Sequence, residues 1–299
     1  MKRIIWGVTI LAFAGLAGFL TLAAQAPAPA APDALKEIVF LSGPVDHGRP
    51  GSGSHDYVRD LKLLQNCLEN SPNVKIKTKF FEGKAPAVSE FQDAAAIVVL
   101  SSSDRDAKET HPLFPPDPTT DHQRYNAETT AYLKSVDALT RKGMGVVVLH
   151  YAVWAENWAA RSFYMQWLGG LWVQIPSKNP MDEWSMTLMN ESHPILRGVK
   201  PWTFSEEIFC NFFLPRDPRR TDLLLATPAK SPVGPQVAAF AFQREDGHRG
   251  LTFGGVHFHK NLGMDDHRRF LLNGIVWAAG MEVPAGGVQS TVSEELLKQ

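Results

Sequence analysis

Two histidines separated by one residue lie near the carboxyl end of the chain, in the segment Gly255–Asn261. Side chains two apart on a β-strand project from one face, so His257 and His259 are expected to point together. A third histidine, His150, directly follows the apolar run Gly145–Leu149, which is typical of a buried strand. With Glu207 nearby, three imidazoles and a carboxylate would suit Zn²⁺, Mn²⁺ or a similar divalent ion.

The same residues have two simpler interpretations. The histidines can hydrogen-bond one another and the edge of a sheet with no ion present. A histidine and a glutamate in one cleft can also act as base and acid, taking a proton next to a ketone or activating water. The sequence therefore leaves three roles open for His150, Glu207 and His259: metal-assisted chemistry, acid–base chemistry and a structural role.

Short apolar runs alternate with segments of helical spacing in the first half of the chain. Strands are expected over Glu37–Leu41, Val74–Phe81, Ala95–Leu100 and Gly145–Leu149, and helices over Tyr57–Leu68, Ala127–Arg141 and Trp158–Leu168. This alternation predicts a mostly parallel α/β sheet with helices on both faces, whose ligands bind beyond the carboxyl ends of the strands. His150 and the loop histidines His47 and His55 fall at that edge.

The second half of the chain is richer in strand-like segments. They are Trp184–Met189, Glu207–Phe213, Asp222–Ala226, Val237–Phe242 and Gly250–Phe253, followed by a final helix over Asp266–Ala279. No repeat or long break in composition divides residues 34–284. We therefore expect extra strands that extend the same sheet, one domain over residues 35–284 and a C-terminal tail over residues 285–299.

The N-terminus has the layout of a secretory signal. Lys2 and Arg3 precede the apolar stretch Ile4–Leu22, which is followed by Ala24–Ala26. The sequence predicts a signal peptide over residues 1–26, a Pro/Ala linker over residues 27–34 and an extracytoplasmic location, periplasmic or secreted. The apolar stretch is also nearly long enough for a membrane anchor, so membrane contact is expected only if this segment is not cleaved.

Composition excludes several classes of function. The 299 residues include 30 Lys+Arg and 31 Asp+Glu, a formal net charge of -1, without a sustained basic run. Nucleic acid is therefore not an expected partner. Cys67 and Cys210 lack the spacing of a zinc ribbon or a disulfide framework, and the sequence leaves them free, buried or bridged.

Several segments carry a family resemblance through their order and spacing. They are Val39–Gly43 with the loop His47–His55, Val148–His150, Leu168–Gly170, His193–Ile195, Glu206–Phe209, Gly254–Asn261 and Asn273–Gly280. On these segments the chain resembles the ThuA-like (trehalose utilisation) family, which has a flavodoxin-like, class I glutamine amidotransferase-like fold. In the amidotransferases the turn at His150 carries a cysteine nucleophile, His259 matches their histidine, and Asn261 replaces their glutamate. Because attack on an amide needs that thiolate, the resemblance implies the fold without glutaminase activity.

The resemblance also implies a role in carbohydrate metabolism, with a disaccharide or a 3-keto-glycoside as substrate, and it favours Glu207 over its neighbour as the functional glutamate. The substrate-binding candidates are His47, His55, Tyr151, Trp154 and Asn261. Tyr151 and Trp154 could offer a flat face to a sugar ring, although aromatic residues at this spacing usually pack a helix on a sheet. The alternative function is a non-catalytic sugar-binding or scaffolding module.

Overall fold

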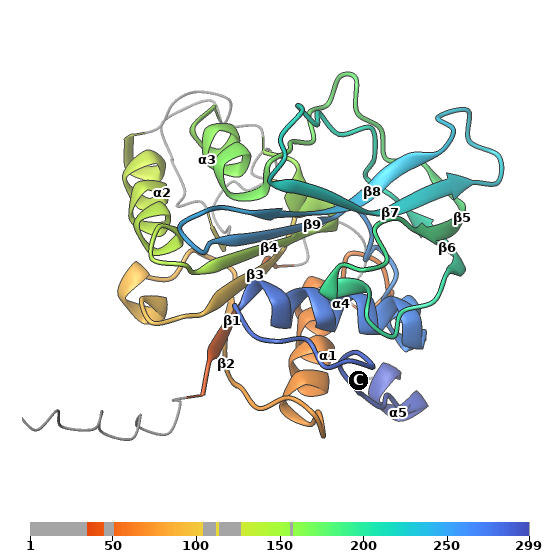
Figure 1. Ribbon diagram of the computed structural model, residues 1–299, viewed down its shortest axis with the longest axis horizontal. Helices are drawn as coiled ribbons and strands as arrows, with labels where there is room; N and C mark the ends of the chain where they lie inside the picture. Colours follow the sequence, from red (N-terminus) through yellow and green to blue (C-terminus); the bar gives the residue numbers. More distant parts are fainter. Residues whose placement is uncertain (1–34, 45–50, 104–111, 114–126, 156–157, 299) are drawn as a thin grey trace, which may run out of the picture. The chain divides into compact units, whose positions relative to one another are not determined.

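Nine strands form one sheet in the part of the chain that the computed structural model describes, which is residues 35–44, 51–103, 112–113, 127–155 and 158–298 (Figure 1). The expected signal peptide, the linker and His47 lie outside these residues. None of the described helices has the length and apolar character needed to cross a membrane.

Five parallel strands form the first half of the sheet. They are β1 (Glu37–Ser42), β2 (Lys77–Glu82), β3 (Ala96–Leu100), β4 (Gly145–Leu149) and β9 (Arg249–Phe253). Their order, β2-β1-β3-β4-β9, is that of the flavodoxin-like sheet. Strands β3 and β4 are buried along their whole length, which explains their unbroken apolar runs.

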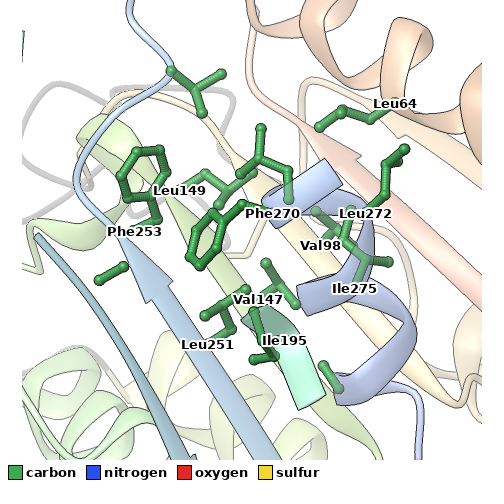
Figure 2. Close-up of a cluster of buried hydrophobic side chains, with 14 of the residues drawn as sticks. Leu64, Val98, Val147, Leu149, Ile195, Leu251, Phe253, Phe270, Leu272 and Ile275 are labelled. Atoms are coloured by element: carbon green, nitrogen blue, oxygen red, sulfur yellow. The ribbon is translucent and has the colours of Figure 1, made fainter. Parts of the chain in front are cut away.

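Helices cover both faces of this parallel region. Within the described ranges the four long helices are α1 (Tyr57–Glu69), α2 (Ala127–Thr140), α3 (Trp158–Leu168) and α4 (Asp265–Ala278). Alternate residues of β1, β3 and β4 enter two separate cores, one shared with α1 and α4 and one shared with α2 and α3. Figure 2 shows part of the first core, where Phe270, Leu272 and Ile275 of α4 lie among side chains of β3, β4 and β9.

Four antiparallel strands continue the sheet beyond β9. They are β5 (Met181–Leu188), β6 (Trp202–Glu207), β7 (Arg220–Pro228) and β8 (Gln236–Gln243), in the order β9-β8-β7-β5-β6. Each runs antiparallel to its neighbours. The expectation of extra strands in the same sheet is confirmed, and the fold is a flavodoxin-like α/β sheet with an antiparallel extension.

Short helical turns and the C-terminal segment complete the fold. The turns are η1 (Val88–Phe91), η2 (His150–Val153), η3 (Pro194–Leu196) and η4 (His259–Gly263), and the last helix is α5 (Glu294–Lys298). The segment expected as a tail packs back on α4. Val288 is buried and its N–H donates to Asn273 Oδ1 at 2.7 Å, and Arg268 Nε donates to Ser290 Oγ at 2.8 Å.

Two expected strands are wrong. The first, Glu207–Phe213, is absent because β6 ends at Glu207 and the residues after it form only isolated bridges. The second should have carried His257 and His259, but β9 ends at Phe253. Gly254 then passes so close to the Phe209 carbonyl oxygen that no side chain would fit, and Val256 has a φ of +88°. The regular alternation of side chains therefore stops before the two histidines.

Candidate metal centre

Two loop residues, the first residue of η2 and one strand end meet at the carboxyl edge of the parallel strands. His150 directly follows β4, and His257 lies in the loop after β9. His55 lies in the loop between β1 and α1, and Glu207 is the last residue of β6. This edge is where open α/β sheets bind ligands, because the loops that leave neighbouring parallel strands converge there.

One potential ligand atom from each of these four residues lies within 4.8 Å of the others. His55 Nε2 lies 3.1 Å from His150 Nε2 and 3.0 Å from His257 Nδ1, and the latter two atoms are 3.4 Å apart. Glu207 Oε2 lies 3.2 Å from His257 Nδ1, 3.6 Å from His150 Nε2 and 3.7 Å from His55 Nε2. A tetrahedral ion bonded at about 2.0–2.1 Å needs ligand atoms about 3.3–3.4 Å apart. The six separations, 3.0–3.7 Å, lie on both sides of that value, so the spacing of the four atoms suits a tetrahedral ion.

The backbone is strained at the same place. Among the described residues, four that are not glycine have positive φ, and three of them belong to this centre: His55 at +51°, His150 at +48° and Val256 at +88°. The left-handed region is unfavourable for residues with a Cβ, most of all for a β-branched residue such as valine. Strain of this kind collects at functional sites, where the surrounding structure holds it in place.

Neighbouring groups orient the potential ligands. His150 Nδ1 lies 3.3 Å from the Gly254 carbonyl oxygen, and donation to that oxygen leaves the Nε2 lone pair facing the other histidines. Glu207 Oε1 accepts a hydrogen bond from Asn179 Nδ2 at 2.9 Å. Behind the centre, Glu206 Oε1 accepts the His257 N–H at 2.9 Å, which fixes the loop after β9.

The electrostatics favour the protonation states that bind a cation. Burial lowers the pKa of His150 well below its usual range, and the neighbouring His55 lowers it further. Burial alone would raise the pKa of Glu207, but hydrogen bonds from His257 and His55 hold it well below its usual range. A neutral imidazole with a free lone pair and an ionised carboxylate are the forms that coordinate a metal.

The structure separates His257 from His259, the pair expected to chelate together. His257 joins the centre, whereas His259 Nδ1 lies 2.7 Å from Asp60 Oδ1, and both of these side chains are buried beside α1. The turn at Gly254 and the positive φ of Val256 send the two imidazoles in different directions. Asn261 is also directed elsewhere, since its Nδ2 donates to the Ser205 carbonyl oxygen and to Glu206 Oε2.

Aromatic residues border the centre on the side of η2. The half-buried ring of Tyr151 stacks on Phe209 at 5.4 Å and lies 6.1 Å from the His55 ring. Trp154 is only 6% exposed and packs against Trp172 at 4.7 Å. Trp154 therefore belongs to the core, and Tyr151 is the one of the two expected sugar-binding aromatics that lies beside the histidines.

The cysteines lie in the protein interior. Cys67 and Cys210 are both free and buried. Burial raises the pKa of both thiols, that of Cys210 to about 12. Both side chains are therefore uncharged thiols at physiological pH, and neither provides the thiolate of an amidotransferase.

Sequence reasoning missed two residues that hold predicted site residues in place: Asn179, which binds Glu207 of the centre, and Asp60, which binds His259 outside it. No motif surrounds Asn179, and no feature of the sequence would have identified it. Asp60 did leave a signal, because it lies three residues after Tyr57 and four before Leu64 on the buried face of α1. A carboxylate at a core-facing helical position needs a buried partner, which here is His259.

The comparisons with known proteins agree on the fold. A family model described as ThuA, trehalose utilisation, matches residues 93–278. A putative ThuA-like protein from Bacteroides uniformis superposes with a TM-score of 0.55 at 13% identity, covering 88% of this chain and 98% of that one. A cytoplasmic protein from Salmonella typhimurium LT2 superposes with a TM-score of 0.52 at 11% identity, covering 81% and 99%. No sequence of a curated protein matches the chain.

Proposed function

This chain belongs to the ThuA, or trehalose utilisation, family, and from that premise we propose that it acts on a disaccharide or a 3-keto-glycoside by metal-assisted chemistry. His55, His150, His257 and Glu207 would hold the ion. The observation that carries the proposal is the convergence of their four donor atoms at the spacing of a tetrahedral ion. Zn²⁺ and Mn²⁺ both accept imidazole and carboxylate ligands.

A bound ion would supply a Lewis acid that polarises an oxygen atom of the sugar, and that oxygen would join the four side chains as a fifth ligand. The residues around the ion differ in burial and therefore in their access to a sugar. His150 is fully buried, with Nε2 at 3.1 Å from His55 Nε2 and 3.4 Å from His257 Nδ1. Glu207 has the most exposed side chain of the four, at 17%, so a sugar would approach from its side.

Acid–base chemistry without an ion is supported less well. His259 is buried, and its Nδ1 is engaged by Asp60, so it is poorly placed to exchange a proton with a sugar at the centre. The sugar-binding module rests on the missing nucleophile and on the aromatic residues after His150, and of these residues Trp154 is in the core. Tyr151 is then the aromatic residue from which a sugar contact is expected, beside the proposed ion.

Metal analysis of the purified protein, together with turnover of a sugar panel, tests the proposal. We expect about one divalent ion per chain, its loss in the double variant His150→Ala/His257→Ala, and conversion of a disaccharide or its 3-keto form only by the loaded protein. His193→Asn is the matched control, since His193 caps η3 through a hydrogen bond to Ile195 N–H that asparagine can also accept. Wild-type protein that holds no stoichiometric ion, and that converts no sugar with added Zn²⁺ or Mn²⁺, would contradict it.

The N-terminal sequence supports a further part of the proposal, that the protein works outside the cytoplasm. Residues 1–26 have the charge and apolar pattern of a secretory signal. Cell fractionation followed by N-terminal sequencing tests this part. Protein recovered from the periplasm or the medium without residues 1–26 is the expected result, and cytoplasmic protein that keeps Met1 would contradict it.

A further inference from the structure

We propose that Asn179 is a positioning residue that restricts Glu207 to a single donor oxygen at the metal centre. This inference rests on the proposed function. Asn179 Nδ2 donates to Glu207 Oε1 at 2.9 Å. The other oxygen, Oε2, faces the three histidine nitrogens at 3.2–3.7 Å. The two oxygens of one carboxylate therefore have different partners, one outside the centre and one within it.

The backbone around Asn179 is anchored on both sides. Lys178 and Cys210 exchange two backbone hydrogen bonds, with Lys178 N–H donating at 3.2 Å and Cys210 N–H at 2.8 Å. Ile208 N–H donates to the Pro180 carbonyl oxygen at 3.3 Å. Met181, two residues after Asn179, pairs with Glu207 in the register of β5 and β6. The short amide side chain is thus fixed opposite the carboxylate, although Asn179 itself is exposed.

An amide suits this position chemically. It donates a hydrogen bond without a positive charge, so it orients the carboxylate but does not compete with a cation for its charge. Carboxylates bind metal ions through one oxygen or through both. A donor on Oε1 favours the first mode, because binding through both oxygens would break the hydrogen bond to Asn179. The solvent-facing side of the centre, where Glu207 lies, then stays open for a fifth ligand from outside the protein.

A purely structural role for Asn179 makes a different prediction. Its hydrogen bond is at the surface, so losing it should change the free energy of unfolding by less than about 1 kcal/mol. A positioning role acts instead on metal affinity and on the coordination of the ion. Removing a group that orients a metal ligand typically weakens metal binding by about 10–100-fold, and the exposure of Asn179 places the expected loss near 10-fold.

Titration of the full chain with Co²⁺ alone tests the inference, because the visible absorption of Co²⁺ reports its coordination independently of turnover. The variants are Asn179→Leu, which keeps most of the bulk, and Asn179→Ala. Asn190→Leu is the matched control, since Asn190 is an exposed asparagine beyond the opposite end of β5 that donates to the Asp222 carbonyl oxygen at 2.7 Å.

Both Asn179 variants should bind Co²⁺ about 10-fold more weakly, with weaker absorption typical of a higher coordination number, while Asn190→Leu matches the wild type. Asn179 variants with unchanged affinity and an unchanged spectrum would overturn the inference and leave the metal centre intact. Wild-type protein that takes up no Co²⁺ would instead overturn the proposed function, and the role of Asn179 with it.

Discussion

The substitution Asp60→Asn tests whether the buried partner of His259 carries a charge. Asp60 lies on the buried face of α1, with Oδ1 at 2.7 Å from His259 Nδ1. Among the described residues its Oδ2 has no hydrogen-bond partner. Asparagine keeps the shape of the side chain and an oxygen that can accept the His259 Nδ1–H, but it has no charge.

The expected effect follows from the pKa of Asp60. Burial raises this pKa from 3.8 to about 6, although the hydrogen bond from His259 acts in the opposite direction. Below pH 3.8 the carboxyl is protonated in the folded and the unfolded state. As the pH rises through the folded pKa, the stability of the wild type falls by about 3 kcal/mol, at about 1.4 kcal/mol for each unit of the shift. The variant has nothing to ionise at this position and keeps that stability.

Urea unfolding at a series of pH values measures the difference between the two proteins. Near pH 4 the two proteins should be similarly stable. In both, one oxygen of residue 60 accepts the hydrogen bond from His259, and the second polar group of that side chain, the hydroxyl of the protonated acid or the NH₂ of the amide, has no partner. Near pH 7 Asp60→Asn should be more stable by about 3 kcal/mol. Asp93→Asn, which removes an exposed carboxylate, should show no such rise. A variant that is less stable than the wild type near pH 7 would refute the reasoning and indicate a charged Asp60–His259 pair.

Three other predictions concern buried residues. Glu206→Ala leaves the N–H of His257 without its acceptor. The variant should have a free energy of unfolding lower by about 3 kcal/mol, measured in urea, and should bind Co²⁺ more weakly. An unchanged free energy of unfolding together with unchanged Co²⁺ affinity would contradict this. Burial lowers the pKa of His267 to about 4. The free energy of unfolding of the wild type should therefore fall by about 3 kcal/mol as the pH falls from 6.5 to 4. A His267→Phe variant whose stability in urea falls equally over this pH range would contradict the prediction. Trp154→Ala removes a core side chain packed on Trp172 and should cost about 3–5 kcal/mol in urea unfolding, a result that a sugar-contacting surface residue would not give.

The parallel half of the fold could be predicted well from the sequence because buried strands and helices show a local pattern of apolar residues. Strand β4 covers Gly145–Leu149, the same residues as its apolar run. Helix α3 covers Trp158–Leu168, as its spacing indicates. Both elements bury apolar residues at regular intervals along their whole length, so the short-range periodicity of apolar residues is enough to predict them. The position of His150 at the end of β4 followed directly.

The membership of the centre could not be predicted in the same way. His55 and His150 are 95 residues apart in the chain, and His55 and His257 are 202 apart. Periodicity relates residues within a few turns, so it does not show which distant loops meet. It also placed His259 beside His257, because nothing in a two-residue spacing reveals that Val256 adopts a positive φ.

The position of His150 links the fold to the proposed chemistry. Its φ of +48° marks a sharp turn at the first residue of η2, directly after β4. Here the side chain is fully buried and its Nε2 faces three other donor atoms at 3.1–3.6 Å. The enclosed imidazole agrees better with the proposed role of a metal ligand than with that of a base that takes a proton from a sugar. In the proposed centre, the strained turn would fix the position of this ligand.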